Sequence, residues 1–387
     1  MDRVDPKVDE AIETLNMKDG PSRRKLLKGT GLVSATAAAS ALLAACSSSS
    51  SPASAAAKDT AGNFPKTPAW QFWFVNHVTT NTFFTPTQYG FADAAAILDI
   101  PVPKWTGSTN SVASQMVAQI NAAVSAKAAG IATTLINSSS FTTPVANAMS
   151  AGIPVLSYNA DGVVSKTGVA DIGCNRLAYV GQALFTSGQQ LGERIKSLTT
   201  PGEVAIFIET PGTANIQPRF DGANSILSPL GYKVAEITTT TVPATILANE
   251  KAYLLAHKSV KGAFAVDSTS TSFLAQALSE TGLSHLPNGG FDTVPQTLTN
   301  IKAGTTGFTI YQDPYLQGFL PTLYMYLYNI SGGTLVPSDT DTGLSFITKS
   351  NLTQYNVASR YQGSTTAQKY VPRPSGAISN PPATTST

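Results

Sequence analysis

Short apolar runs of strand length recur along the middle of the chain and alternate with segments of helical character. The apolar runs are 71–75, 131–136, 154–158, 204–208, 233–237, 263–266 and 308–311. The helix-like segments include 112–129, 179–197, 215–228 and 273–280. Short apolar strands separated by helices are typical of βαβ units, in which helices cover both faces of a parallel sheet. The pattern therefore predicts an α/β fold with parallel sheets.

Two stretches of the chain repeat the same order of elements. In residues 130–159 and again in 261–292, a strand is followed by a Ser/Thr-rich loop, a short helix, a glycine and a second strand. The polar residues that end these strands are Asn137, Asn159, Asp267 and Asp292. Ligands of open α/β sheets bind beyond the carboxyl ends of the strands, so the repeat predicts two similar lobes that face one cleft. The alternative is that these side chains only cap the helices that follow.

The first 45 residues have the features of an export signal. An alanine-rich, mildly apolar stretch at 31–45 is too short for a transmembrane helix but fits the core of a signal peptide. The preceding SRRKLLK at 22–28 resembles the twin-arginine export signal. LAAC, which ends at Cys46, resembles the lipobox of bacterial lipoproteins. We therefore expect a twin-arginine/lipoprotein signal peptide at 1–45 and a lipid on Cys46 that anchors the protein to the outer face of the cell membrane.

Low-complexity segments flank the predicted folded body. Residues 46–68 are rich in Ser and Ala, and residues 362–387 are rich in Pro, Ser and Thr. We expect a flexible tether and a disordered tail. Cys174 is the only cysteine besides Cys46, so the exported protein would fold without a disulfide.

Composition narrows the function further. Only 12% of the 387 residues are charged, and 25 basic against 23 acidic residues give a net charge of +2, which argues against a nucleic-acid partner. The three histidines show no HExxH spacing, and no GxGxxG at a strand–helix turn, Walker loop or GxSxG occurs. We therefore expect no cofactor, metal or catalytic residues, and the near-neutral charge suits a neutral ligand. An exported enzyme is an alternative function.

From residue 70 to about residue 360 the chain resembles the type I periplasmic binding proteins for sugars, the ribose-binding-like receptors of ABC importers. The stretches that carry the resemblance are FVNHVTTNTFF, GIATTLIN, AGIPVLSYN, RLAYVGQ, GAFAVDS, GGFD and GFTIYQDPYLQG. It implies two Rossmann-like lobes joined by a three-crossing hinge that closes on the ligand. The partners implied are an ABC permease and its ATPase, and we expect a monomer.

The resemblance also implies domain boundaries. The crossings fall near Gly181, Gln312–Asp313 and Thr342–Gly343. The N-terminal lobe would consist of 69–180 plus 313–342, and the C-terminal lobe of 181–312 plus 343–361. A receptor of this fold that presents its closed form to a sensor kinase or chemoreceptor is a second alternative function. The predicted export signal excludes a repressor of the same fold.

The ligand-binding residues implied by the resemblance lie at the cleft. Phe83 and Phe84 would form a platform for the C–H faces of a sugar or polyol. The alternative is that one of them belongs to the core, because adjacent aromatic residues do not easily face the same cleft. The polar candidates are Asn76, His77, Asn81, Asn137, Asn159, Gln217, Arg219, Asp267, Asp292 and Gln312.

Three departures from ribose-binding relatives change the expected ligand. Asn159 and Ala160 stand where relatives carry an Arg after the fourth-strand acid. Gln217 stands in place of a second Arg, with Arg219 two residues on, and His77 replaces a small hydroxyl residue. The loss of two guanidinium groups removes planar bidentate donors. We therefore expect another sugar or a polyol in place of ribose, with Trp105 as a further candidate for specificity.

Overall fold

The computed structural model describes residues 67–137, 139–162 and 176–355. The predicted signal peptide, Cys46, Cys174 and the predicted tail lie outside the described residues, as does the predicted tether except for residues 67 and 68.

The first of two sheets collects strands from the first half of the chain and one from its end. Its order is β11-β5-β4-β3-β1-β2, and the pairings among the described strands are parallel. The strands are β1 (Phe72–Asn76), β2 (Lys104–Gly107), β3 (Gly130–Leu135), β4 (Val155–Asp161), β5 (Tyr179–Gly181) and β11 (Thr340–Asp341). The helices that accompany them are η1 (Thr82–Phe84), α5 (Thr85–Leu98), α6 (Ala113–Ser125), α7 (Thr142–Ser150) and α13 (Leu316–Ile330).

The second sheet has the same architecture. Its order is β12-β10-β9-β8-β6-β7, in which β12 runs antiparallel to β10. The strands are β6 (Glu203–Ile208), β7 (Lys233–Thr238), β8 (Ala263–Ala265), β9 (Asn288–Phe291), β10 (Thr309–Tyr311) and β12 (Ser345–Ile347). The helices are α8 (Leu184–Leu198), α9 (Gln217–Leu227), η2 (Ser228–Leu230), α10 (Pro243–Ala256), α11 (Ser268–Glu280), α12 (Pro295–Ala303) and η3 (Leu352–Gln354).

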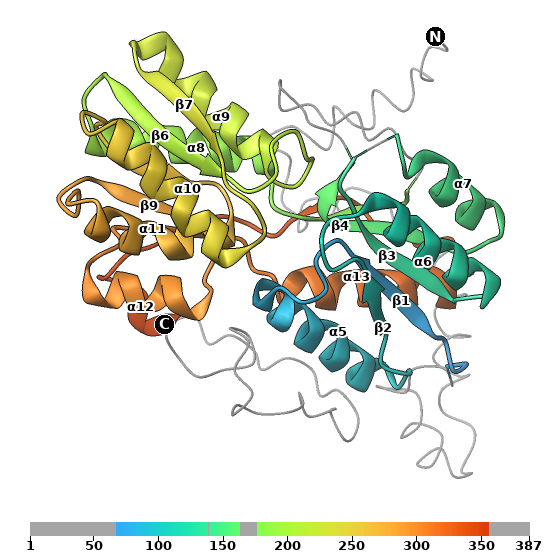
Figure 1. Cartoon of the computed structure of the whole chain (residues 1–387). Coiled ribbons are helices and arrows are strands. Elements are labelled where there is room, and N and C mark those ends of the chain that lie inside the picture. Colours follow the sequence, from blue (N-terminus) through green and yellow to red (C-terminus); the bar gives the residue numbers. More distant parts are fainter. Residues whose placement is uncertain (1–66, 138, 163–175, 356–387) are drawn as a thin grey trace, which may run out of the picture. The chain divides into compact units, whose positions relative to one another are not determined.

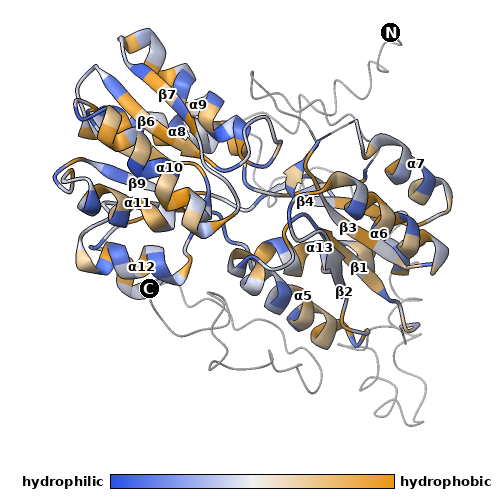
Figure 2. Ribbon diagram, in the orientation of Figure 1, coloured by the Kyte–Doolittle hydropathy of each residue, from blue (hydrophilic) through white to orange (hydrophobic). Residues whose placement is uncertain are grey.

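Both faces of each sheet are buried, as continuous apolar strands require. In the first sheet Ile131 packs in the core on the side of α6 and α7, while the next residue, Ala132, packs in the core on the side of α5 and α13. In the second sheet Ile206 packs toward α8 and α9, and Phe207 packs toward α10 and α11. Figure 1 shows these helices beside their strands, and Figure 2 shows hydrophobic residues gathered on the strands of both sheets.

The chain passes between the sheets three times: after β5, after β10 and after β11. The predicted fold class is therefore confirmed: two lobes with largely parallel sheets, joined by three crossings. One prediction of local structure was wrong, because residues 179–181 pair with β4 as a strand and the helix begins only at Leu184.

An ion-pair network fastens the first lobe near the third crossing. Arg176 is buried, and its guanidinium contacts the carboxylates of Asp161 at the end of β4 and Asp339 just before β11. The Asp339 carboxylate also accepts a hydrogen bond from the backbone N–H of Tyr179. The network thus joins β4 and the start of β5 to β11, which lies more than 150 residues further along the chain.

Each lobe contains a helix crossing that only glycine permits. In the first lobe a Cβ on Gly318 of α13 would lie 1.9 Å from the backbone oxygen of Thr87 in α5. In the second lobe a Cβ on Gly188 of α8 would lie 2.1 Å from the backbone oxygen of Arg219 in α9. Both distances are far below a van der Waals contact, so the helix backbones touch directly.

Candidate functional site

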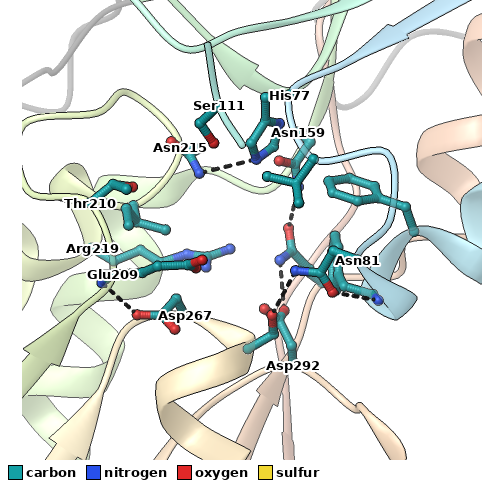
Figure 3. A pocket seen from close by; sticks show the side chains of 16 residues that line it. His77, Asn81, Ser111, Asn159, Glu209, Thr210, Asn215, Arg219, Asp267 and Asp292 are labelled. Carbon is teal, nitrogen blue, oxygen red and sulfur yellow. Dashed lines mark hydrogen bonds between the residues drawn. The ribbon is translucent and has the colours of Figure 1, made fainter. Parts of the chain in front are cut away.

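A polar pocket lies where the carboxyl ends of strands from both sheets meet. The empty space that its side chains enclose is about 450 Å³, part of which is open to solvent. Figure 3 shows side chains from both lobes gathered around it. The lining residues are His77, Val78, Asn81, Phe83, Phe84, Ser111, Asn159, Glu209, Thr210, Asn215, Ile216, Arg219, Asp267, Ser268, Asp292 and Gln312.

Phe83 and Phe84 both line the pocket and both belong to the core of the first lobe. They follow each other in η1, and their rings meet edge to face with centroids 4.7 Å apart and planes at 82°. This perpendicular arrangement lets both neighbours reach the pocket, so the alternatives of platform and core are not exclusive. Trp105 packs behind Phe84 at 6.0 Å between ring centroids and does not line the pocket.

Asn81 and His77 bring the first lobe into contact with the second. Asn81 caps η1 by accepting the Phe83 N–H, and its amide nitrogen lies 3.5 Å from the Ser268 hydroxyl. His77 lies directly after β1, with Nδ1 3.1 Å from the Thr134 hydroxyl and Nε2 3.3 Å from the amide nitrogen of Asn215. Burial lowers the pKa of His77 to about 4, so the ring is neutral near pH 7.

Asn159, Gln312 and Asp292 form a chain of hydrogen bonds along the pocket wall. The Gln312 side chain donates to the Asp292 carboxylate at 2.7 Å. The Asn159 amide donates to the side-chain oxygens of Gln312 at 3.5 Å and Gln317 at 3.1 Å. Gln312 therefore connects a residue of the first sheet with a residue that follows the second.

Asp267 caps the helix that follows it and also lies at the pocket, so the two alternatives from the sequence do not exclude each other. Its Oδ1 accepts the Ser270 N–H at 2.7 Å and so caps α11, while Oδ2 accepts the Glu209 N–H at 2.9 Å. The residue also lines the pocket. Burial raises the pKa of Asp267 to about 6, against the opposing effect of these hydrogen bonds, and burial also raises the pKa of Asp292.

Arg219 is the guanidinium of the pocket, and it is 2% exposed. It donates to the backbone oxygen of Val266 at 3.0 Å and to the Gln182 side chain at 3.1 Å, and it lies over the Phe291 ring at 4.2 Å. Its Nε is buried and finds no acceptor among the described residues. Burial lowers the pKa of Arg219, but nearby carboxylates, Asp292 first among them, oppose this shift.

Three of the predicted site residues lie outside the pocket lining, where they hold the loops around it. Asn76 donates to the Tyr158 hydroxyl at 2.8 Å, and Asn137 accepts the Ser140 N–H at 2.8 Å. Gln217 turns back onto its own loop and accepts the Gly212 N–H at 2.7 Å. The structure thus brings together His77, Asn81, Phe83, Phe84, Asn159, Arg219, Asp267, Asp292 and Gln312.

Sequence reasoning missed seven lining residues: Val78, Ser111, Glu209, Thr210, Asn215, Ile216 and Ser268. Glu209 and Thr210 directly follow β6, so the rule that carboxyl ends of strands carry the site could have found them. Ser268 adjoins Asp267 and could have been inferred with it. Val78 follows β1 as Thr210 follows β6, so the same rule could have found it. Ser111, Asn215 and Ile216 depend on loop conformation, for which the sequence carried no signal.

Two Rossmann-like lobes that share one polar pocket define a two-lobed solute-binding protein. The chain belongs to the periplasmic binding protein family: the family described as "Periplasmic binding protein domain" matches residues 72–332. Within the described residues there is no group of three or more His, Cys, Asp or Glu side chains that could hold a metal ion.

Individual relatives agree with this assignment. The chain is 45% identical over 316 residues to the xylose/arabinose-binding protein XylF of Sulfolobus acidocaldarius, which covers 80% of this chain and 78% of that protein. A solute-binding protein of an ABC transporter from Burkholderia graminis, solved with D-arabinose, is 27% identical with a TM-score of 0.68 over 76% of this chain and 99% of that one. A carbohydrate transporter protein from Acidothermus cellulolyticus, solved with myo-inositol, shares the fold at 22% identity, with a TM-score of 0.67 over 76% of this chain and 99% of that chain.

Membership of this family implies an exported protein. In the part of the chain that the structure describes, no helix is long and apolar enough to cross a bilayer.

Proposed function

We propose that the protein is the substrate-binding receptor of an ABC importer and binds a neutral sugar or polyol in the pocket between its lobes, without catalysis. The observation that carries the proposal is the composition of the pocket, which combines two phenyl rings with polar side chains from both lobes. Two of the polar atoms in these side chains lack a hydrogen-bond partner in the part of the chain that the structure describes. The buried Arg219 Nε lacks an acceptor and the buried Asn215 Oδ1 lacks a donor among the described residues.

A hydroxyl group can satisfy both kinds of unpaired atom, because it donates one hydrogen bond and accepts others. The carboxylates of Asp267 and Asp292 accept from hydroxyls, and the Phe83 and Phe84 rings offer an apolar surface to sugar C–H groups. Since these groups are divided between the lobes, a ligand that contacts both would favour the closed arrangement.

The relatives suggest which sugars to examine first. One is named for binding xylose and arabinose, and a solved relative was crystallised with D-arabinose. We infer that a pentose is the leading candidate among neutral sugars. D-Xylose and both enantiomers of arabinose are the first probes, and myo-inositol represents the polyols.

The direct test is thermal unfolding of the mature protein with a panel of neutral sugars and polyols. A ligand at 100 times its Kd stabilises the folded state by about 2.7 kcal/mol, so a binder raises the melting temperature by several degrees. Phe84→Ala should lose most of the shift, whereas Thr186→Ala, on an exposed position of α8, should retain it. The absence of a shift with every compound would contradict the proposal.

We further propose that the receptor is exported by the twin-arginine route and anchored through lipid on Cys46. The support is the order of SRRKLLK, an alanine-rich core and LAAC. Mass spectrometry of membrane-derived protein should find an N-terminal, lipid-modified Cys46. Cys46→Ala should release the protein from the membrane fraction, and a protein that stays bound would contradict the anchor.

A further inference from the structure

Glu209 is the acidic pocket residue that the hydrogen-bond networks leave unused. It follows β6 directly and lines the pocket beside Arg219 and Asp267 (Figure 3). Its backbone N–H donates to the Asp267 carboxylate. Its own carboxyl group, in contrast, has no hydrogen bond or ion pair to any residue that the structure describes.

The surroundings of Glu209 are predominantly acidic. The other acidic groups of the pocket are Asp267 at the start of α11 and Asp292 after β9. The remaining charged or titratable groups of the lining are Arg219 of α9, beside Glu209, and the neutral His77 after β1. The two Arg219 nitrogens that donate hydrogen bonds do so to neutral oxygens. Three carboxyl groups therefore share one pocket with a single guanidinium.

Such a cluster favours a neutral form of one carboxyl group, because like charges in a buried site destabilise each other. Burial, with smaller contributions from Asp267 and Asp292, raises the pKa of Glu209 to about 9. Near pH 7 the side chain therefore carries a proton, and a protonated carboxyl donates a hydrogen bond that a carboxylate does not.

We propose that Glu209 contacts the ligand as a protonated carboxylic acid, donates a hydrogen bond to a sugar oxygen, and selects neutral sugars against acidic ones. The proposal rests on the proposed sugar-binding function and adds a residue and a charge selectivity to it. Asp267 and Asp292 accept hydrogen bonds from sugar hydroxyls, while Glu209 complements them as a donor. A uronate would place a further negative charge among three acidic groups.

The test is calorimetric titration of D-xylose and L-arabinose into wild type and Glu209→Gln between about pH 6 and pH 10. The Kd of wild type should rise about tenfold from pH 8 to pH 10 as Glu209 loses its proton. Glu209→Gln keeps a neutral donor, so its Kd near pH 7 should stay within about threefold of wild type and its pH dependence should flatten. Glu193→Gln, on an exposed part of α8, should keep the wild-type profile.

Charged analogues complete the test. D-Glucuronate should not bind wild type near pH 7, and D-glucosamine should bind no more tightly than D-glucose. Tighter binding of glucosamine that Glu209→Gln abolishes would overturn the proposal, since it would show an ionised Glu209 paired with a cation. An unchanged pH profile in Glu209→Gln would overturn the assignment of Glu209 alone. Failure of wild type to bind any neutral sugar at any pH would overturn the proposed function and this proposal with it.

Discussion

Asn159 and Asp292 occupy corresponding places in the two lobes and share an unusual backbone conformation. Asn159 lies two residues before the end of β4, and Asp292 directly follows β9. Both have positive φ, 62° for Asn159 and 74° for Asp292, and Gln312 hydrogen-bonds to both. Asn and Asp tolerate the left-handed region better than other residues with a side chain. The internal repeat of the sequence thus extends to backbone conformation.

Substitution of Asp292 should separate backbone strain from ligand contact. Asp292→Gly and Asp292→Ala both remove the carboxylate, so each should weaken sugar binding at least about tenfold. At positive φ the Cβ of alanine is strained, and alanine has no side-chain hydrogen bond to offset the strain, whereas glycine has no Cβ. The free energy of unfolding of Asp292→Ala should therefore be lower than that of Asp292→Gly by roughly 1 kcal/mol. Urea unfolding without sugar measures the second effect. Equal stability of the two variants would contradict the strain argument.

His77 should make the stability of the protein depend on pH. Its pKa is about 4 in the folded protein and 6.5 in the reference state, so the unfolded chain takes up a proton first as the pH falls. The contribution of the neutral His77 to the free energy of unfolding is therefore fully present above pH 6.5. It falls by roughly 3 kcal/mol as the pH is lowered to 4.

The raised pKa of Asp267 acts in the opposite direction. Its contribution is present below its unfolded pKa and is lost as the pH rises through about 6. The measurement is therefore the difference in free energy of unfolding between wild type and His77→Gln, taken at several pH values. The advantage of wild type should fall by roughly 3 kcal/mol from about pH 7 to pH 4. The exposed His285 provides the matched control, and a constant difference at position 77 would refute a neutral, buried His77.

The two carboxylates that contact Arg176 should differ in their contribution to stability. The Asp339 side chain is 60% exposed, so Asp339→Asn should cost no more than about 1 kcal/mol. Asp161→Asn removes the carboxylate whose side chain is 15% exposed and leaves the buried Arg176 with only the exposed Asp339, so it should cost about 3–5 kcal/mol. Denaturant unfolding of both variants gives the comparison. Equal losses of stability in the two variants would contradict the argument that the buried ion pair contributes more than the exposed one.

The glycine crossing between α8 and α9 should not tolerate a methyl group. Gly188→Ala would push against the backbone oxygen of Arg219, so we expect a loss of about 1–3 kcal/mol in stability. Because Arg219 lines the pocket, the Kd for the sugar should rise as well. Thr186→Ala on the exposed side of the same helix is the control. A fully stable Gly188→Ala with unchanged Kd would show that the helices can separate without consequence.

Much of the fold could be predicted because the central strands are buried on both faces. Runs such as 131–136 and 204–208 are apolar at nearly every position, so they are visible in the sequence. The strands β2, β11 and β12 were missed because they are edge strands of only two to four residues. The strand β5 lies inside the sheet, between β11 and β4, but it has only three residues and was taken as the beginning of a helix.

The pocket was predictable where backbone topology alone brings residues together. Asn159, Asp267 and Asp292 follow from the rule on carboxyl ends of strands, while Phe83, Phe84 and Gln312 needed the family resemblance. Gln217 and Arg219 show what the sequence could not predict. Both lie in the first turn of α9, but Gln217 hydrogen-bonds to Gly212 of the preceding loop, whereas Arg219 hydrogen-bonds to Val266 beyond β8. Side-chain direction within one helical turn depends on packing that no linear pattern records.

The order in which the lobes are completed has a consequence for biosynthesis. The first lobe needs α13 and β11, at 316–341, and these are synthesised only after most of the second lobe. Until then α5 lacks the helix that covers it, and the Arg176 network lacks Asp339. A nascent chain therefore cannot complete its lobes one after the other on the ribosome. Chaperones would meet an incomplete first lobe until residues 316–341 have been synthesised.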